Sequence, residues 1–158
     1  MSSEFTHLTP EGNVHMVDVS GKAITVRRAV AEAEVALPFE LSRRLFSGDL
    51  PKGDALAVVR VAGIMAAKRT AELIPLSHPL PIDAVEIEVE QSQTGARILA
   101  TVSTAGPTGV EMEAMTAVSI AALTLYDMVK GIERGVEIGP VRLLHKSGGK
   151  SGTWDRRS

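Results

Sequence analysis

An acid and a lysine three residues apart are the first candidates for chemistry in this sequence. Asp127 and Lys130 lie in the run 125–130, where the other side chains are large and apolar. Residues three apart on a helix are neighbours, so these two side chains can meet. Charges among apolar groups are costly unless they serve a function, and a lysine in such a setting can titrate near neutral pH and transfer protons. The alternative is an ordinary ion pair on the surface.

Another acid, Glu113, belongs to the same predicted helix, which we expect to span 110–133 and to stop at Gly135. Fourteen residues separate Glu113 from Asp127, which corresponds to roughly 21 Å along a helix axis. One compact reaction centre cannot touch both acids. Either the substrate is long, or the site takes one acid from each of two chains.

This predicted helix has two distinct faces at 100° per residue. One face is apolar and is expected to contact the core: Val118, Ala121, Leu125, Met128, Val129 and Ile132. The other face is semi-polar, with Glu113 and Asp127 at its ends and Ala117, Ile120 and Thr124 between them. The amphipathic pattern therefore places the core on the first face.

Further polar groups lie in segments that contain turn residues. In the loop 76–81, His78 lies between Ser77 and Pro79 and can bond a phosphate or shuttle a proton, unless it is an ordinary surface histidine. In the tail 146–152, flexible backbone N–H groups and two lysines suit an oxyanion, although such a tail can also be disordered. It is not a P-loop, because Leu144 stands where the first glycine is required and no helix follows. Lys52 and Lys68 are weaker candidates of the same kind.

Composition limits the classes of function. The chain has 158 residues, of which 44% are hydrophobic, and this suits one domain with a real core. A net charge of −2 and only 3% aromatic residues argue against a nucleic-acid binder. Without cysteine there can be no disulfide, thiolate or Cys-ligated metal, and the four histidines lack the spacing of a metal site. No signal peptide is visible and the stretch 114–126 is too short and polar for a bilayer, so a cytoplasmic protein without a membrane segment is expected.

Hydrophobic periodicity and turn residues predict seven elements in the order β-α-α-β-β-α-β. The strands are expected at 23–37, where a helix is the rival, and at 84–91, 96–103 and 136–145, with helices at 38–46, 55–73 and 110–133. If the two early helices form one crossover, this is an α+β, ferredoxin-like split βαβ fold with an open antiparallel sheet. We expect an N-terminal arm at 1–20, a domain at 21–146, and a tail at 147–158 that contributes to the site. Oligomerisation would cover the open sheet.

Several runs together resemble one known family over about residues 6–152. They are HMVDV at 15–19, AGIMAAKRT at 62–70, IPLSHPL at 74–80, TGVEMEAMTA at 108–117, LYDMVK at 125–130, IGPVRLL at 138–144 and KSGGKSG at 146–152. They resemble the molybdenum cofactor biosynthesis protein C family, the cyclic pyranopterin monophosphate synthases. The resemblance implies a ferredoxin-like subunit in a hexamer built as a trimer of dimers, with the active site at the dimer interface. It also implies a 3′,8-cyclised dihydro-GTP substrate, with cyclic pyranopterin monophosphate and diphosphate as products.

The resemblance also implies roles for individual residues. Asp127 matches the family's active-site acid, Lys130 its catalytic lysine and Lys52 a second essential lysine. Substrate-binding positions are matched by Leu76, Ser77, His78, Met112 and Glu113, and pocket-lining positions by Arg27, Glu111, Lys68, Lys146 and Lys150. Two departures are Ser77, where many members have cysteine, and Pro51, where many have histidine before the lysine. No cofactor is required, and any Mg²⁺ would come with the triphosphate, held by phosphate and water.

Two other classes of function stay open at this point. A ferredoxin-like oligomer can sense a nucleotide without chemistry, because this fold often binds ligands only. An RNA-binding module would show steeply salt-dependent affinity, although the low aromatic content disfavours it.

Overall fold

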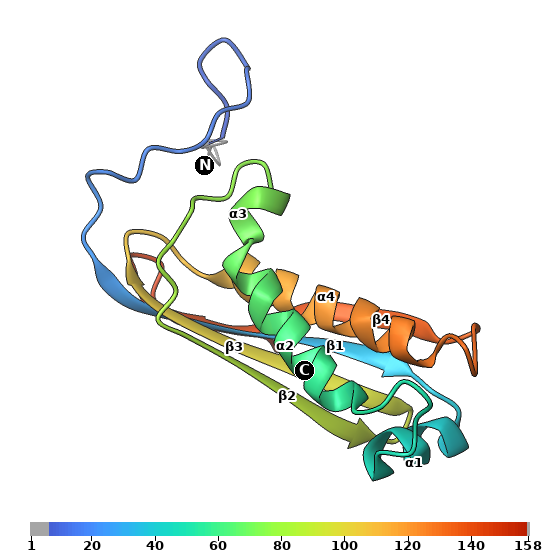
Figure 1. Ribbon diagram of the computed structural model, residues 1–158. Helices are drawn as coiled ribbons and strands as arrows, with labels where there is room; N and C mark the ends of the chain where they lie inside the picture. The colour runs from blue at the N-terminus through green and yellow to red at the C-terminus, as the bar shows by residue number, and fades with distance from the viewer. Residues whose placement is uncertain (1–6, 158) are drawn as a thin grey trace.

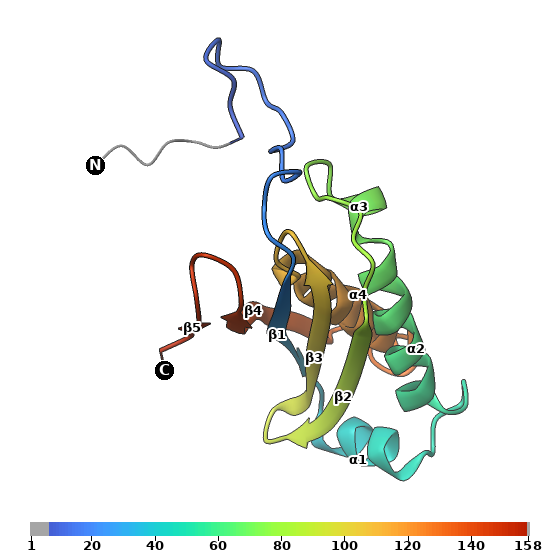
Figure 2. The same ribbon diagram turned by 90° about the vertical axis from the view of Figure 1, so that its left-hand side faces the viewer.

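One antiparallel sheet carries the two long helices of the chain on a single face (Figures 1 and 2). The computed structural model describes residues 7–157. Across the sheet, the strands follow the order β2 (Ala84–Ser92), β3 (Gly95–Gly106), β1 (Thr25–Ala36), β4 (Glu137–Ser147) and β5 (Trp154–Asp155), with every neighbouring pair antiparallel. The helices are α1 (Phe39–Ser47), α2 (Ala55–Lys68), α3 (Thr70–Leu73) and α4 (Glu111–Val129).

Short side chains let the sheet and α4 approach closely. Alanines with 0% exposure alternate along β1 and recur on the inner side of α4: Ala29, Ala31, Ala33, Ala114, Ala117, Ala121 and Ala122. Larger residues of the same core, including Val35, Ile98 and Leu125, are also fully buried between the two surfaces. The core therefore fixes α4 as a straight element above β1 and β3 (Figure 1).

The helix α2 fits between α4 and β2 because it has a glycine at the crossing point. A Cβ atom at Gly63 would lie 2.9 Å from Ile87 Cδ1 on β2 and 3.4 Å from the carbonyl oxygen of Ala117 on α4. This packing covers the side of α4 that the sequence pattern marked as semi-polar. Consequently Ala117 and Glu113 are buried, with exposures of 0% and 3%.

Most of the predicted architecture is confirmed. The α+β class, the open antiparallel sheet and the ferredoxin-like order of elements are present. The segment 23–37 forms a strand rather than the rival helix, and the predicted hairpin is the pair β2–β3. Asp54 is the N-cap of α2, because its Oδ1 accepts a hydrogen bond from the Ala57 N–H.

Several predicted boundaries are wrong for local reasons. The helix expected at 55–73 breaks at Arg69, where the Thr70 hydroxyl donates to the carbonyls of Ala66 and Ala67 and competes with the helical ladder. The helix expected to reach residue 133 ends at Val129, because the N–H groups of Ile132 and Glu133 both donate to the Val129 carbonyl. Ile132 is therefore 43% exposed instead of part of the core.

The ends of the chain add two features that the sequence pattern does not predict. The tail folds back as the two-residue strand β5, which pairs His145 with Asp155 and Lys146 with Trp154. Within the predicted arm, Leu8 and Val14 form an isolated bridge, and the arm extends beyond the α3 end of the molecule (Figures 1 and 2). Residues 1–6 of the predicted arm and Ser158 of the predicted tail lie outside the described residues.

By length and composition alone, α4 could cross a membrane, and it is the one helix among the described residues for which this holds. However, 56% of its apolar stretch is buried inside the protein, against β1, β3 and α2. Its hydrophobicity is thus explained by its place as the central core helix.

The helix-free face of the sheet is organised around one buried carboxylate. Glu32 on β1 is 2% exposed and bonds Arg97 on β3 at 2.6 Å and Arg142 on β4 at 2.5 Å. Burial by itself would raise the pKa of Glu32, but the hydrogen bonds and charges of Arg142 and Arg97 lower it overall. At pH values above the acid range the ionised Glu32 carboxylate therefore links the three strands β3, β1 and β4.

We predict that Glu32→Gln lowers the free energy of unfolding by about 1–3 kcal/mol at pH 7, because two guanidinium groups lose a buried charged acceptor. Since the folded pKa of Glu32 is lowered, this stabilisation is present above the unfolded pKa and is lost as the pH falls through the folded pKa. Urea unfolding at pH 7 and at acid pH measures it. The control is Glu34→Gln, whose Oε1 lies 3.6 Å from Arg142 on a partly exposed side chain. Equal effects of the two variants would contradict the account.

Candidate active site

A cavity of about 330 Å³ lies at the N-terminal end of α4. Its walls come from the loop before β2, the β3–α4 loop, the first turn of α4 and the arm. Six predicted site residues line it together: Leu76, Ser77, His78, Glu111, Met112 and Glu113. The cavity combines apolar walls with polar groups, as small-molecule sites do. We call it the main cavity.

His78 holds the arm against the main cavity. Its Nε2 lies 2.6 Å from the carbonyl oxygen of Val17. A carbonyl oxygen only accepts hydrogen bonds, so Nε2 must carry the hydrogen, and Nδ1 is the ring nitrogen left for other partners. Val17 and Val19 of the arm, and Lys22 just after it, line the main cavity.

A second, larger hollow of about 740 Å³ adjoins the main cavity and is basic. It shares Lys22, Thr108, Gly109 and Glu111 with the main cavity and adds Arg27 and Lys150. Three cationic side chains around one groove suit a polyanion such as a phosphate chain. We call it the basic groove.

Arg27 fixes the shape of the basic groove. Its Nε donates to the Gly106 carbonyl at 2.9 Å and its Nη2 to the Pro107 carbonyl at 3.1 Å. Gly149 of the tail lies so close that a Cβ there would overlap the guanidinium group, and its φ of +73° also favours glycine. Lys146 Nζ donates to Ser151 Oγ, which positions it beside the same groove. Gly149, Lys150 and Ser151 of the tail thus line the basic groove.

Glu113 is the most perturbed acid of the site. Burial raises its pKa to about 6, its own backbone N–H lowers it in part, and the charge of Glu111 raises it further. The carboxyl also faces a side cavity of about 120 Å³, together with Lys68, Glu72 and His78. Lys68 therefore lines the same side cavity as Glu113, and does not line the basic groove.

The predicted acid–lysine pair forms a three-member cluster at the other end of α4. Lys130 Nζ lies 2.6 Å from Asp127 Oδ1, and Lys52 Nζ lies 3.3 Å from Asp127 Oδ2. Lys52 also donates to the Asp127 carbonyl at 2.7 Å, which satisfies a free acceptor of the helix C-terminus. Lys52, the residue after Pro51, thus contacts Asp127 of the predicted catalytic pair.

Contrary to the expectation of a lysine that titrates near neutral pH, the pKa of Lys130 is raised, because Asp127 accepts its hydrogen bond and opposes its charge. The pKa of Asp127 is lowered by Lys130 and then by Lys52. The side chains of Asp127 and Lys130 are about half exposed, while Leu125, Met128 and Val129 of the same run face the core. The two charged side chains are therefore half exposed to solvent and are not enclosed by the apolar side chains of the run 125–130.

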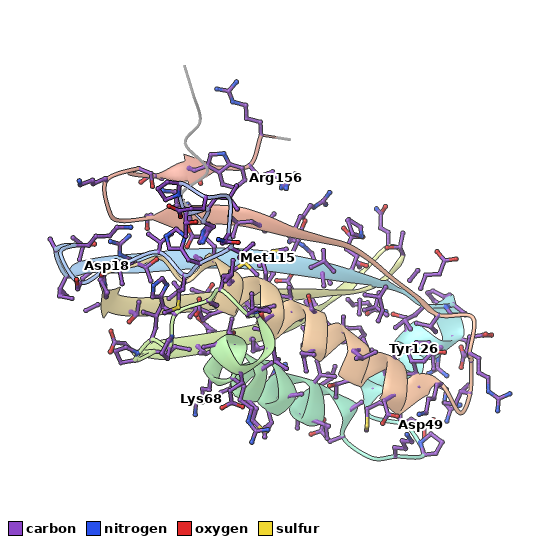
Figure 3. All side chains as sticks on the ribbon, turned by 90° about the horizontal axis from the view of Figure 1, so that it is seen from above. Asp18, Asp49, Lys68, Met115, Tyr126 and Arg156 are labelled. Carbon is purple, nitrogen blue, oxygen red and sulfur yellow. The ribbon has the colours of Figure 1, made fainter. Side chains whose placement is uncertain are left out.

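The two groups of candidate residues lie at opposite ends of the molecule. Asp18 of the arm and Lys68 lie toward one end, whereas Tyr126 and Asp49, near the Asp127–Lys52 cluster in sequence, lie toward the other (Figure 3). The straight helix α4 holds Glu113 and Asp127 roughly 21 Å apart. The candidate residues of a single chain thus form two separate groups: the main cavity with its basic groove, and the cluster Lys52–Asp127–Lys130.

Sequence reasoning missed two cationic or titratable residues of the main cavity, Lys22 and His7. Lys22 is the first lysine of the chain and precedes Arg27 by five residues, but nothing in that spacing reveals a groove. It lies beside His78 only in the folded chain, where both residues line the main cavity. Among residues 7–157, no three His, Asp or Glu side chains gather as metal ligands.

The fold and these two groups define a class: a small α+β protein with a cavity and an adjoining basic groove at one end of its central helix and an acid–lysine cluster at the other. Residues 16–149 match the MoaC family. The chain belongs to the MoaC family.

Curated relatives match over nearly the whole chain. The cyclic pyranopterin monophosphate synthase of Corynebacterium efficiens is 55% identical over 152 residues, which cover 96% of this chain and 98% of the relative. The protein of that name from Roseiflexus castenholzii is 55% identical, with 95% and 96% covered. Cyclic pyranopterin monophosphate synthase 2 of Mycobacterium tuberculosis is 51% identical over 156 residues, with 99% and 93% covered.

We predict that Glu113→Gln stabilises the ligand-free protein at pH 8 by about 1–2 kcal/mol, because it removes a buried charge. The folded pKa of Glu113 is raised, so its relative stabilisation is fully present below the unfolded pKa of 4.5 and is lost as the pH rises through about 6. The gain from the substitution should therefore vanish at pH 4. Thermal or urea unfolding at both pH values measures it, with Glu111→Gln as the less buried control. A gain that is the same at both pH values would contradict the assigned cause.

Proposed function

We propose that the chain is a cyclic pyranopterin monophosphate synthase. It converts (8S)-3′,8-cyclo-7,8-dihydroguanosine 5′-triphosphate to cyclic pyranopterin monophosphate and releases diphosphate, an early step of molybdenum cofactor biosynthesis. The observation that carries the proposal is 51–55% identity, over at least 95% of this chain, to relatives that bear this name. The reaction makes the chain a lyase of the phosphorus–oxygen class.

The geometry of the hollows supports this substrate. The guanine-derived ring binds in the main cavity, with Leu76 and Met112 against its faces and with Ser77, His78, Glu111 and Glu113 toward its polar atoms. The triphosphate extends into the adjoining basic groove, where Lys22, Arg27 and Lys150 neutralise it, and Lys146 supports the tail wall. Lys68 completes the charge balance near Glu113. No cofactor takes part, and Mg²⁺ would arrive bound to the phosphates.

The cluster Lys52–Asp127–Lys130 supplies the chemistry. The reaction opens an aminal-like ring, rebuilds a pyrazine ring and closes a cyclic phosphate, so it needs proton transfers and a counter-charge for departing diphosphate. Lys130 and Asp127 act as a coupled proton-transfer pair, and Lys52 serves proton transfer or the cyclising phosphate. In the free chain the raised pKa of Lys130 keeps it charged. Burial against a second chain and substrate lowers that pKa and prepares the amine for catalysis.

The separation of the two groups of candidate residues at opposite ends of α4 supports a site that is shared with a second copy of the chain. The cluster of one subunit completes the cavity of another, so the active site lies at a dimer interface, and three such dimers form a hexamer. Exposed apolar residues support assembly: Val58, Val61 and Met65 on α2 are 45%, 55% and 47% exposed and follow helical spacing. We place the enzyme in the cytoplasm, since a chain without cysteine needs no oxidising compartment.

Incubation with the cyclised nucleotide tests the proposal. The wild-type protein should release diphosphate and form the pterin. Lys130→Ala should fold and keep its oligomeric state, but its turnover should be slower by about 100-fold or by a larger factor. Its fold should survive because exposed ion pairs contribute little stability. Arg134→Ala, at a cationic residue just beyond the helix, is the matched control and should stay active. Binding without turnover by the wild-type protein would indicate a nucleotide sensor instead, and near-normal release by Lys130→Ala would remove that lysine from the mechanism.

A further inference from the structure

Glu113 lies between two cavities and lines both of them. It lines the main cavity and also the side cavity of about 120 Å³. His78 and Leu80 are the two other residues common to both. The remaining walls of the side cavity include Ala67 and Lys68 at the end of α2 and Ala71 of α3. A single water molecule needs only about 10–15 Å³ of such space, so the side cavity has room for water behind Glu113.

The carboxyl of Glu113 lacks the partners that a buried charge needs. Its residue is 3% exposed, and among residues 7–157 no basic side chain forms a salt bridge with it. Its own backbone N–H is the hydrogen-bond donor that acts on it. A buried carboxyl without a cationic partner readily holds a proton. This state differs from that of Glu32, which is equally buried but is bonded to two arginines.

The charged and titratable groups around Glu113 come from every neighbouring segment. Glu111 lies on the same helix, His78 on the loop before β2, and Lys68 and Glu72 across the side cavity. His7 of the arm and Lys22, just after the arm, also line the main cavity. The Nε2–H of His78 donates a hydrogen bond to the carbonyl oxygen of Val17. Glu113 is thus the acid that faces both hollows without a fixed protein partner.

Building on the proposed function, we propose that Glu113 relays protons from water in the side cavity to a ring nitrogen of the substrate in the main cavity. When the carbon–nitrogen bond of the aminal-like ring breaks, its electron pair stays on the nitrogen. That nitrogen takes the carboxyl proton of Glu113. The resulting carboxylate then takes a proton from bulk solvent, which the side-cavity water passes on by accepting one proton and donating another. The cluster Lys52–Asp127–Lys130 then works on the opposite side of the ring.

Steady-state kinetics over a pH range test the relay. General acids contribute about 10²–10⁴-fold, so Glu113→Gln should lower kcat about 100-fold and change KM less than threefold, because glutamine keeps the shape and a hydrogen bond. In the wild type, kcat/KM should decline as the pH rises above about 6, and this limb should be absent from Glu113→Gln. Glu113→Asp should recover part of kcat together with the limb.

A second variant tests the water pathway without touching the acid. Ala71→Leu fills the side cavity from α3 and should lower kcat about tenfold at unchanged KM. The matched control is Ala57→Leu, the same substitution at an exposed position of α2 that lines neither cavity, and it should behave as wild type.

The outcomes separate the relay from the proposed function. A wild-type protein that releases no diphosphate overturns both. An active wild type with an equally active Glu113→Gln, or with a Glu113→Gln whose defect is confined to KM, overturns the relay and leaves the proposed function intact. Loss of kcat in Glu113→Gln with the high-pH limb still present would also reject the relay, because the titrating group would then be another residue.

Discussion

The rigid packing of α4 on the sheet is the constraint on which the rest of the structure depends. Buried alanines on both surfaces bring the helix close to β1 and β3, and the glycine of α2 lets a second helix press on it from the side. The helix therefore cannot bend to bring its ends together. Glu113 stays at one end, in a cavity, and Asp127 stays at the other, in the open. One compact reaction centre within a single chain therefore cannot include both acids.

Irregular segments complete the site at the N-terminal end of α4. The arm reaches the cavity because His78 holds the Val17 carbonyl, and the tail reaches the groove because its glycines fit against Arg27. Both segments lie outside the regular elements of the ferredoxin-like plan. The sheet and helices thus provide a rigid frame, while the segments before β1 and after β4 line the main cavity and the basic groove. A fold that is common to many proteins can carry a particular site in this way.

Sequence patterns predicted the elements well and the environments poorly. The alternating valines and glutamates of β2 and the cap at Asp54 are local signals, and the structure confirms what they indicate. By contrast, the burial of Glu113 comes from α2, which packs on a face of α4 that looked semi-polar. The helix also ends at Val129, four residues earlier than predicted, and Lys130 just beyond it is half exposed. Lys22 lines the main cavity together with His78, a residue 56 positions further along the chain. Such long-range contacts leave no periodic trace in one sequence.

The most direct test of the account is whether two subunits share one active site. Lys130→Ala damages the cluster and His78→Ala damages the cavity, so each purified variant should be inactive alone. If the site joins the cluster of one chain to the cavity of its partner, each mixed dimer holds one intact site. Dissociation and reassociation of an equal mixture should then restore about a quarter of wild-type diphosphate release. Activity no greater than the sum of the two separate variants, in oligomers shown to contain both chains, would contradict the shared site.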